Sequence, residues 1–350
     1  MGSVVVAADL DPQAVTAPNA LRRSRFRGRG LPGMVGLRLL TLVPVLALVS
    51  AGLFAAAAVS PFDPLVGYLG TRYESTGQAD KALLAAQLGF DRPWYELLGR
   101  WLGGVATGDL GMSRTYGQPV SQVVAERIPW TMLLVLVALT VAMLTAVALG
   151  AWTGMRRGGA VDRLVSTVCV VVQGLPPFVL ALATIAIFAV GLRWLPPAGL
   201  TDAGADPDAA QVIRHLVLPA SALALSQLPW LLLAVRESVS QNRTEDFVTG
   251  ALARGIDTGT VARRHILPMS LAPFVTVLGV RLPEIVVGAV LVEEIFSWPG
   301  IAGAFVRSAT DLDMPLLALL TVGTTCAVMV GSLCADIACV LLDPRVRADG

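Results

Sequence analysis

Four long segments of the chain contain no acidic or basic residue. They cover residues 128–155, 164–192, 216–235 and 314–335. Each has the roughly 20 residues that a helix needs to cross the apolar part of a membrane. Residues 39–59 and 269–292 are also apolar, although the second segment contains Arg281 and Glu284. With 55% hydrophobic residues and a mean hydropathy of +0.70, the chain is predicted to be an all-α polytopic membrane protein with six transmembrane helices.

The arginines predict which side of the membrane each loop faces, because positive residues near the ends of spans remain in the cytoplasm. If both termini are cytoplasmic, the cytoplasmic segments contain Arg22, Arg23, Arg25, Arg27, Arg29, Arg38, Arg156, Arg157, Arg163, Arg236, Arg243, Arg254, Arg263, Arg264, Arg345 and Arg347. The two short outer loops and their borders contain only Arg193, Arg214 and Arg307. This asymmetry predicts cytoplasmic termini and a cytoplasmic loop at residues 236–268.

Composition divides the chain into three parts. Residues 1–37 combine small residues, proline and arginines without apolar periodicity, which predicts a disordered cytoplasmic tail whose arginines contact anionic lipid heads. Residues 38–128 are predicted to form the first transmembrane helix and a long extracytoplasmic loop. The apolar stretch is longer than a signal-peptide core, so a retained anchor is favoured over a cleaved signal. Residues 129–347 are predicted to form a five-helix core.

Within the long outer loop, one segment has clear helical periodicity. Its apolar side chains at helical spacing are Trp94, Leu97, Leu98, Trp101 and Leu102. They predict an amphipathic helix whose aromatic residues suit the membrane interface. Two interpretations stay open: a platform on which a substrate-delivering protein docks, and a cap over the helix bundle.

A charged segment at residues 245–268 separates two apolar segments. Thr244 is predicted to cap a short helix with an acidic first turn, and Gly255 to end that helix in a left-handed turn. A second helix is expected to start at Asp257 or Thr258 and to continue into the next apolar segment. The short helix carries a narrow apolar stripe, which suits docking into the groove of a soluble partner. The stripe consists of Val248, Ala251 and Leu252.

The spacing of this segment resembles the cytoplasmic "EAA" loop of ABC-importer permeases. In that loop a small-residue triplet is followed three residues later by glycine and then by an I-x-L-P motif, which here corresponds to residues 265–268. Thr249 stands where the family usually has an acid, and His265 replaces an aliphatic residue. The residues that the resemblance assigns to coupling with an ATPase are Thr249, Gly250, Ala251, Arg254, Gly255, Leu267 and Pro268.

An ordered series of motifs extends the resemblance over about residues 36–347. The matching positions are 108–111, 119–120, 126–129, 215–219, 245–247, 296–300, 336 and 342–345. They resemble the dipeptide, oligopeptide and nickel subfamily of binding-protein-dependent permeases. The resemblance implies a type I ABC importer permease fold in the bacterial cytoplasmic membrane. It also implies three kinds of partner: a second homologous permease, two cytoplasmic ATPase subunits, and an extracytoplasmic substrate-binding protein. Peptides are the expected substrate, with nickel or another small solute as the alternative.

The sequence predicts that the chain is not an enzyme and binds no cofactor, with ATP and Mg²⁺ on the partner ATPases. A phosphate-binding P-loop needs Gly-Lys-Ser/Thr, and the only lysine, Lys81, follows Asp80. No metal-binding spacing is present, and the cysteines at 169, 326, 334 and 339 lie in apolar spans. The net charge of +1 argues against nucleic acid. An intramembrane enzyme would need facing acids or histidines, and a secondary transporter would need inverted repeats, which are not seen.

Two further sets of residues are expected to have functional roles. Arg281 lies about 18 Å of helix rise into the fifth span, near mid-membrane, where an ionised group costs roughly 2.5–3.5 kcal/mol. Arg281 and Glu284 are therefore expected to face the translocation path or a partner permease, and Pro283 to break the helix locally. At the outer end of this span, the candidates for an outer gate are Ser297, Trp298, Pro299 and Gly300. An interfacial anchor is the alternative for Trp298.

Overall fold

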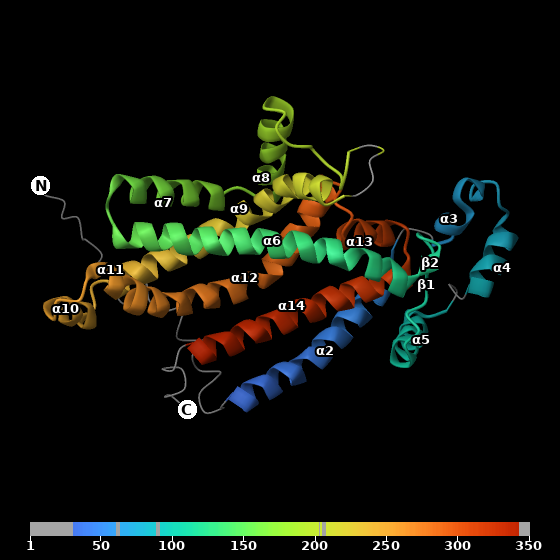
Figure 1. The fold of residues 1–350 in the computed structure, drawn as a ribbon. Helices are drawn as coiled ribbons and strands as arrows, with labels where there is room; N and C mark the ends of the chain where they lie inside the picture. Colours follow the sequence, from blue (N-terminus) through green and yellow to red (C-terminus); the bar gives the residue numbers. More distant parts are fainter. Residues whose placement is uncertain (1–30, 61–63, 89–91, 203, 205–207, 343–350) are drawn as a thin grey trace, which may run out of the picture.

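The computed structural model describes residues 31–60, 64–88, 92–202, 204 and 208–342 (Figure 1). The five long helices are α2 (Leu31–Ala58), α6 (Val120–Met155), α9 (Ala209–Asn242), α12 (Leu267–Ile295) and α14 (Met314–Leu342). The shorter helices are α3 (Pro64–Leu69), the 3-10 helix η2 (Gly70–Arg72), α4 (Gln78–Leu88), α5 (Trp94–Thr107), α7 (Ala160–Gln173), α8 (Pro177–Thr184), the π-helix η3 (Ile185–Gly191), α10 (Asp246–Ala253), α11 (Thr258–Val261), the π-helix η4 (Ala262–Ile266) and α13 (Ile301–Thr310). Two short strands, β1 (Met112–Ser113) and β2 (Gln118–Pro119), pair antiparallel.

Five continuous helical stretches in the described part of the chain are long and apolar enough to cross a membrane. They are Gly33–Ala58, Val120–Met155, Ala209–Asn242, Thr258–Ile295 and Met314–Ala338. A sixth candidate is the pair formed by α7 with α8 and η3, whose two halves meet at a bend of 110°. The all-α polytopic architecture is thus confirmed, and the predicted six spans are reached when this bent pair counts as one.

The spanning segment expected over residues 164–192 is a bent pair of helices and not one continuous helix. α7 lies along α6 and α9, whereas α8 crosses them at a steep angle, packs against α9 and α12, and continues outward as η3 (Figure 1). The break falls between Gln173 and Pro177. Pro176 and Pro177 have no amide hydrogen, and a proline disfavours helical geometry in the residue before it, although it is tolerated at a helix start. Hydropathy does not predict this bend, because both prolines lie within an uncharged apolar segment.

Two predicted boundaries also shift. α2 begins at Leu31, so residues 31–37 are helical and do not belong to a disordered tail. Residues 1–30 lie outside the described residues. α6 begins at Val120 rather than near 129, because Pro119 precedes its first turn and Pro129 is accommodated inside the helix. The expected outer loop is shorter by that amount.

The centre of the bundle is the interface between α6 and α9. Small buried residues recur every four positions along one face of α6, at Ala138, Ala142, Ala146, Gly150 and Gly154. A Cβ atom on Gly150 would lie 2.8 Å from the Leu232 carbonyl oxygen, and one on Gly154 would lie 2.7 Å from that of Arg236. The two backbones are therefore in contact, which is the packing that small-residue faces allow between membrane helices.

This contact predicts a large loss of stability for Gly154→Val. Overpacking a close contact costs roughly 1–3 kcal/mol, and here the obstacle includes backbone that cannot rotate aside. We expect a lower thermal unfolding midpoint for the purified chain in detergent. Gly52→Val on α2 is the matched control, because a Cβ there meets nothing within 4 Å. Equal midpoints for the two variants would contradict the interpretation.

The two ends of the bundle carry different elements (Figure 1). α10 and α11 lie at the same end as the start of α2 and the end of α14. At the opposite end lie α3, α4, α5, the β1–β2 hairpin and α13. Asp313, at the start of α14, is fully buried and accepts hydrogen bonds from the Ser113 hydroxyl (2.6 Å) and the Thr115 amide (3.1 Å). The hairpin is thereby fixed to the bundle.

The amphipathic helix expected in the long loop is confirmed as α5. It packs against α2, where the rings of Phe54 and Trp101 lie 6.1 Å apart. Its stripe residues are only partly buried, so α5 covers the outer part of α2 and still presents apolar surface. The packing agrees with the cap interpretation, and the docking platform stays a prediction.

Candidate functional site

The charged segment folds as a short helix, a turn and a second helix at one end of the bundle. α10 spans Asp246–Ala253 with Glu245 before its first turn. The cap expected from Thr244 is wrong, because its hydroxyl donates instead to the Gln241 carbonyl oxygen (2.9 Å) at the end of α9. Gly255 has φ +80°, which confirms the left-handed turn. The amide of Gly255 donates to the Leu252 carbonyl oxygen (2.9 Å) and closes this turn.

The second helix begins as the sequence predicts. Asp257 caps it by accepting hydrogen bonds from the Thr260 amide (2.8 Å) and the Thr260 hydroxyl (2.9 Å). These hydrogen bonds hold the pKa of Asp257 below its ordinary value. α11, η4 and α12 then follow without a break, so that one helical rod runs from Thr258 to Ile295. A displacement of the charged segment is thus applied directly to the base of α12.

The apolar stripe of α10 does not all face outward. Val248 is buried in the core of the bundle, and Ala251 packs against that core. Val248 is therefore not presented to a partner, because it attaches the short helix to its own chain, whereas Ala251 stays partly exposed. The large apolar side chains that remain exposed here are Phe247, Leu252 and Ile256. Phe247 and Ile256 are surface residues that the stripe did not include.

The small residues of the charged segment border open space. A Cβ atom added to Gly250 or Gly255 meets no atom within 4 Å. Thr249, Arg254 and Pro268 are exposed, and Leu267 is half-buried. The space beside Gly250 and Gly255 is thus unobstructed within this chain.

The base of this segment is fixed by a hydrogen bond between the helices on either side of it. The Asn242 amide nitrogen, at the end of α9, donates to the Ser270 hydroxyl (2.9 Å) in the first turn of α12. Ser270 is fully buried and donates in turn to the Ile266 carbonyl oxygen (2.8 Å). The residues between 242 and 270 therefore form a closed loop.

Arg281 and Glu284 form an ion pair with each other on α12. The Arg281 guanidinium also lies over the ring of Trp230 on α9, 4.4 Å from its centroid. The Arg281 side chain is 15% exposed and that of Glu284 is 55% exposed. The break expected at Pro283 is wrong, because α12 continues through it and through Pro273 as well. Neighbouring helix turns can accommodate a proline in a membrane helix.

Residues 296–300 form a tight turn between α12 and α13. Trp298 is 3% exposed, its indole nitrogen donates to the Trp130 carbonyl oxygen (3.0 Å), and the two indole rings meet edge to face. This burial argues against an interfacial anchor that faces lipid. Ser297 is exposed and has φ +48°, Pro299 is partly buried and Gly300 is buried.

The carboxylate of Glu293 stabilises this turn through a hydrogen bond, a role that the sequence does not predict. The side chain is 1% exposed, and its Oε2 accepts from the Ala302 amide (2.8 Å) at the start of α13. A Cβ atom on Gly300 would lie 2.2 Å from the same carboxyl group, so a larger residue there would displace the Glu293 carboxylate. The signal in the sequence was an acid next to the end of an apolar span, seven residues before a glycine.

Another ion pair joins two of the long helices. Asp336 on α14 pairs with Arg38 on α2, which joins the first and last helices of the bundle. Within the described ranges, no group of three or more His, Cys, Asp or Glu side chains is placed to hold a metal ion.

The chain matches known proteins over most of its length. Residues 146–348 match the family described as "Binding-protein-dependent transport system inner membrane component". An oligopeptide transport system permease protein of Bacillus subtilis is 30% identical over 311 residues, which cover 89% of this chain and 98% of that protein. Proteins named as peptide permeases from Brucella suis and Sinorhizobium fredii are 29% and 28% identical, over 90% and 89% of this chain and 97% of each relative. The chain therefore belongs to the family of inner membrane components of binding-protein-dependent transport systems, the multi-pass permease subunits of ABC importers.

Proposed function

We propose that this chain is one of two permeases in an ATP-driven importer of di- or oligopeptides. The substrate class is supported by the names of the relatives, which are oligopeptide and peptide permeases. The observation that carries the mechanism is the geometry of α10 and the turn after it, which together have three exposed apolar side chains beside two glycines that border open space. A short amphipathic helix of this kind fits a hydrophobic groove on a partner.

In this proposal the end of the bundle that carries α10 faces the cytoplasm and binds an ATPase subunit. Phe247, Leu252 and Ile256 enter the groove, and the open space beside Gly250 and Gly255 lets the walls of the groove approach the backbone. ATP-driven closure of the two ATPases then moves α10. The motion reaches the membrane through α9 and through the continuous helix from Thr258 to Ile295.

The second permease is proposed to cover the face from which η3 projects. After the 110° bend α8 packs against α9 and α12 and η3 projects beyond it, and both carry large apolar side chains that are exposed in this chain. These side chains are Phe178, Leu182, Ile187 and Val190. A substrate-binding protein is proposed to dock at the opposite end from α10, where α5, the β1–β2 hairpin and α13 lie.

Reconstitution tests the proposed function. We expect the chain, with its partner permease, two ATPases and binding protein in proteoliposomes, to take up labelled peptide only when ATP is supplied on the ATPase side. The chain purified alone is expected neither to bind nor to hydrolyse ATP, because it has no P-loop lysine. Uptake of nickel without uptake of peptide would overturn the assignment of substrate. Specific nucleotide binding by the isolated chain would overturn the division of labour.

A further inference from the structure

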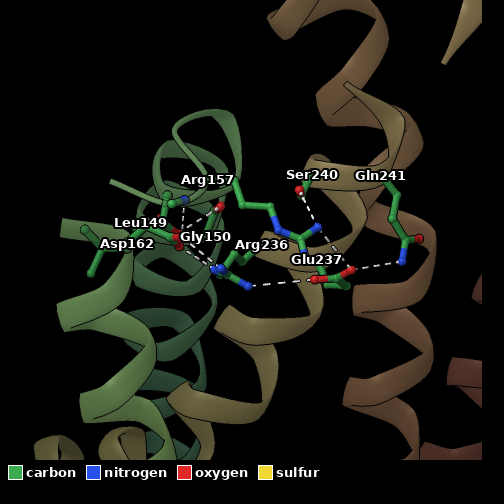
Figure 2. Close-up of polar contacts among 10 residues, drawn as sticks. Leu149, Gly150, Arg157, Asp162, Arg236, Glu237, Ser240 and Gln241 are labelled. Carbon is green, nitrogen blue, oxygen red and sulfur yellow. Dashed lines mark hydrogen bonds and ion pairs between the residues drawn. The ribbon is translucent and has the colours of Figure 1, made fainter. Parts of the chain in front are cut away.

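Asp162 forms the most completely bonded ion pair among the described residues, and its partner Arg236 lies six residues before the end of α9 (Figure 2). Its Oδ1 accepts from Arg236 Nε (2.5 Å) and its Oδ2 from Arg236 Nη2 (2.8 Å). Oδ2 also accepts from the Gly158 amide (2.8 Å). The Asp162 side chain is 3% exposed. One carboxylate thus joins the first turn of α7, the turn between α6 and α7, and the end of α9.

Two further arginines also link α9 to the end of α6 and the turn that follows it. Arg157, in the turn between α6 and α7, donates to the Ser240 hydroxyl (2.9 Å) and pairs with Glu237 (3.6 Å) on α9 (Figure 2). Arg243, just after α9, donates to the Met155 carbonyl oxygen at the end of α6. We call Asp162, Arg157, Arg236 and Arg243 the α7–α9 clamp.

The clamp acts on a stretch of α9 that already touches α6. Gly154 brings the two backbones into contact at Arg236, and Asn242 ties the end of α9 to α12 through Ser270. α10 begins only four residues after Asn242. The clamp therefore fixes the point from which α10 extends.

The chemistry of the pair indicates that it sets an orientation. A buried ion pair contributes little net stability compared with apolar residues of the same size, so holding two helices together would not require one. A bidentate arginine–carboxylate pair fixes both distance and direction. A fixed distance and direction are needed where a small displacement of one helix must move its neighbours by the same amount.

We propose that Asp162 is a positioning residue for coupling: through Arg236 it makes the end of α9 move as one body with α6 and α7 when α10 is displaced. This inference rests on the proposed function, in which the ATPases displace α10. Without the clamp, α10 and the end of α9 move relative to α6 and α7, and ATP hydrolysis proceeds with less transport.

The first test needs no transport. Spin labels are placed at Leu164→Cys on α7 and Ala253→Cys on α10, both exposed, in a background whose four native cysteines are serine. We expect a narrow distance distribution in the full chain in nanodiscs, and a clearly broader one after Asp162→Asn. An unchanged width would overturn the proposal, whether or not the substrate is a peptide.

The second test measures peptide taken up per ATP hydrolysed in the reconstituted complex. We expect Asp162→Asn to lower this ratio at least fivefold, and Arg236→Lys to lower it as well, because lysine keeps the charge but lacks the bidentate geometry. Asp202→Asn is the matched control, since Asp202 is half exposed and contacts Arg214 and His215 at the other end of α9. A ratio unchanged in both variants, or lowered equally by the control, would overturn the proposal. Failure of both variants to assemble would show a purely structural role and overturn it too.

If the wild-type complex takes up no peptide, the proposed function fails, and the spin-label distances still decide the inference.

Discussion

Gly250→Trp is expected to abolish ATP-driven uptake while leaving the chain folded and inserted. Gly250 lies within α10 at ordinary helical geometry, and a Cβ atom there meets nothing within 4 Å. The indole therefore causes no clash inside this chain. In the complex, it stands between the helix and the wall of the ATPase groove.

The expected loss of uptake follows from the binding free energy that a central interface contact contributes. Losing a central contact in a groove costs about 2 kcal/mol or more, which corresponds to about a thirtyfold weaker association. We expect uptake to fall by at least that factor, together with loss of copurifying ATPase. The thermal unfolding midpoint of the isolated chain should stay within about 2 °C, as for a surface substitution.

Gly255→Ala is the control that separates bulk from backbone strain. Gly255 has φ +80°, a conformation that costs a residue with a Cβ roughly 1–2 kcal/mol, but alanine adds almost no volume to the open surface. We expect a mild loss of stability and uptake within threefold of wild type. If Gly255→Ala abolishes uptake and Gly250→Trp does not, the turn conformation matters and close approach of a partner does not.

In the charged segment, the sequence predicts the local backbone features but not which side chains face the core. The positions of Gly255 and Asp257 could be predicted, because each depends on local backbone chemistry that a left-handed turn or a helix cap imposes. The inward direction of Val248 could not, since it depends on where the core lies relative to α10. A stripe seen on an isolated helix does not reveal which of its residues attach the helix to its own chain and which remain for a partner.

For the long spans, too, the sequence predicts some features and not others. Lack of charge predicted where α6, α9, α12 and α14 lie, because an apolar segment of that length has few alternatives in a membrane. The 110° bend after Gln173 depends on two adjacent prolines, which hydropathy does not register. The clamp was missed for a different reason: Asp162 and Arg236 are 74 positions apart, and nothing local marks either one as a partner of the other.

Glu284→Gln is expected to cause the second large loss of transport. Arg281 is mostly buried against Trp230 and pairs with Glu284. Removing one member of a buried pair costs roughly 3–5 kcal/mol, because the remaining charge is left uncompensated. Glu284 is 55% exposed in the isolated chain, so the cost is smaller than this where water or a partner reaches it. We expect uptake to fall about tenfold, corresponding to about 1.4 kcal/mol.

The double variant Arg281→Gln with Glu284→Gln serves as the matched control. It removes both charges together and leaves no unpaired group against Trp230, so we expect it to assemble better than Glu284→Gln alone. Glu126→Gln is a second control, since Glu126 is an exposed acid near the start of α6. Equal effects of the single and double variants would contradict the importance of the pair.

Two readouts distinguish the roles left open for this pair. If it joins the two permeases, Glu284→Gln lowers the yield of the assembled complex, and peptides with free and blocked ends lose uptake equally. If it lines the translocation path, the complex assembles normally and the loss differs between free peptides and those with an acetylated amino end or an amidated carboxyl end. We expect the second pattern, because the exposed side of the pair carries the carboxylate while the guanidinium lies against the aromatic ring. Normal assembly and unchanged selectivity in Glu284→Gln would show that neither role is correct.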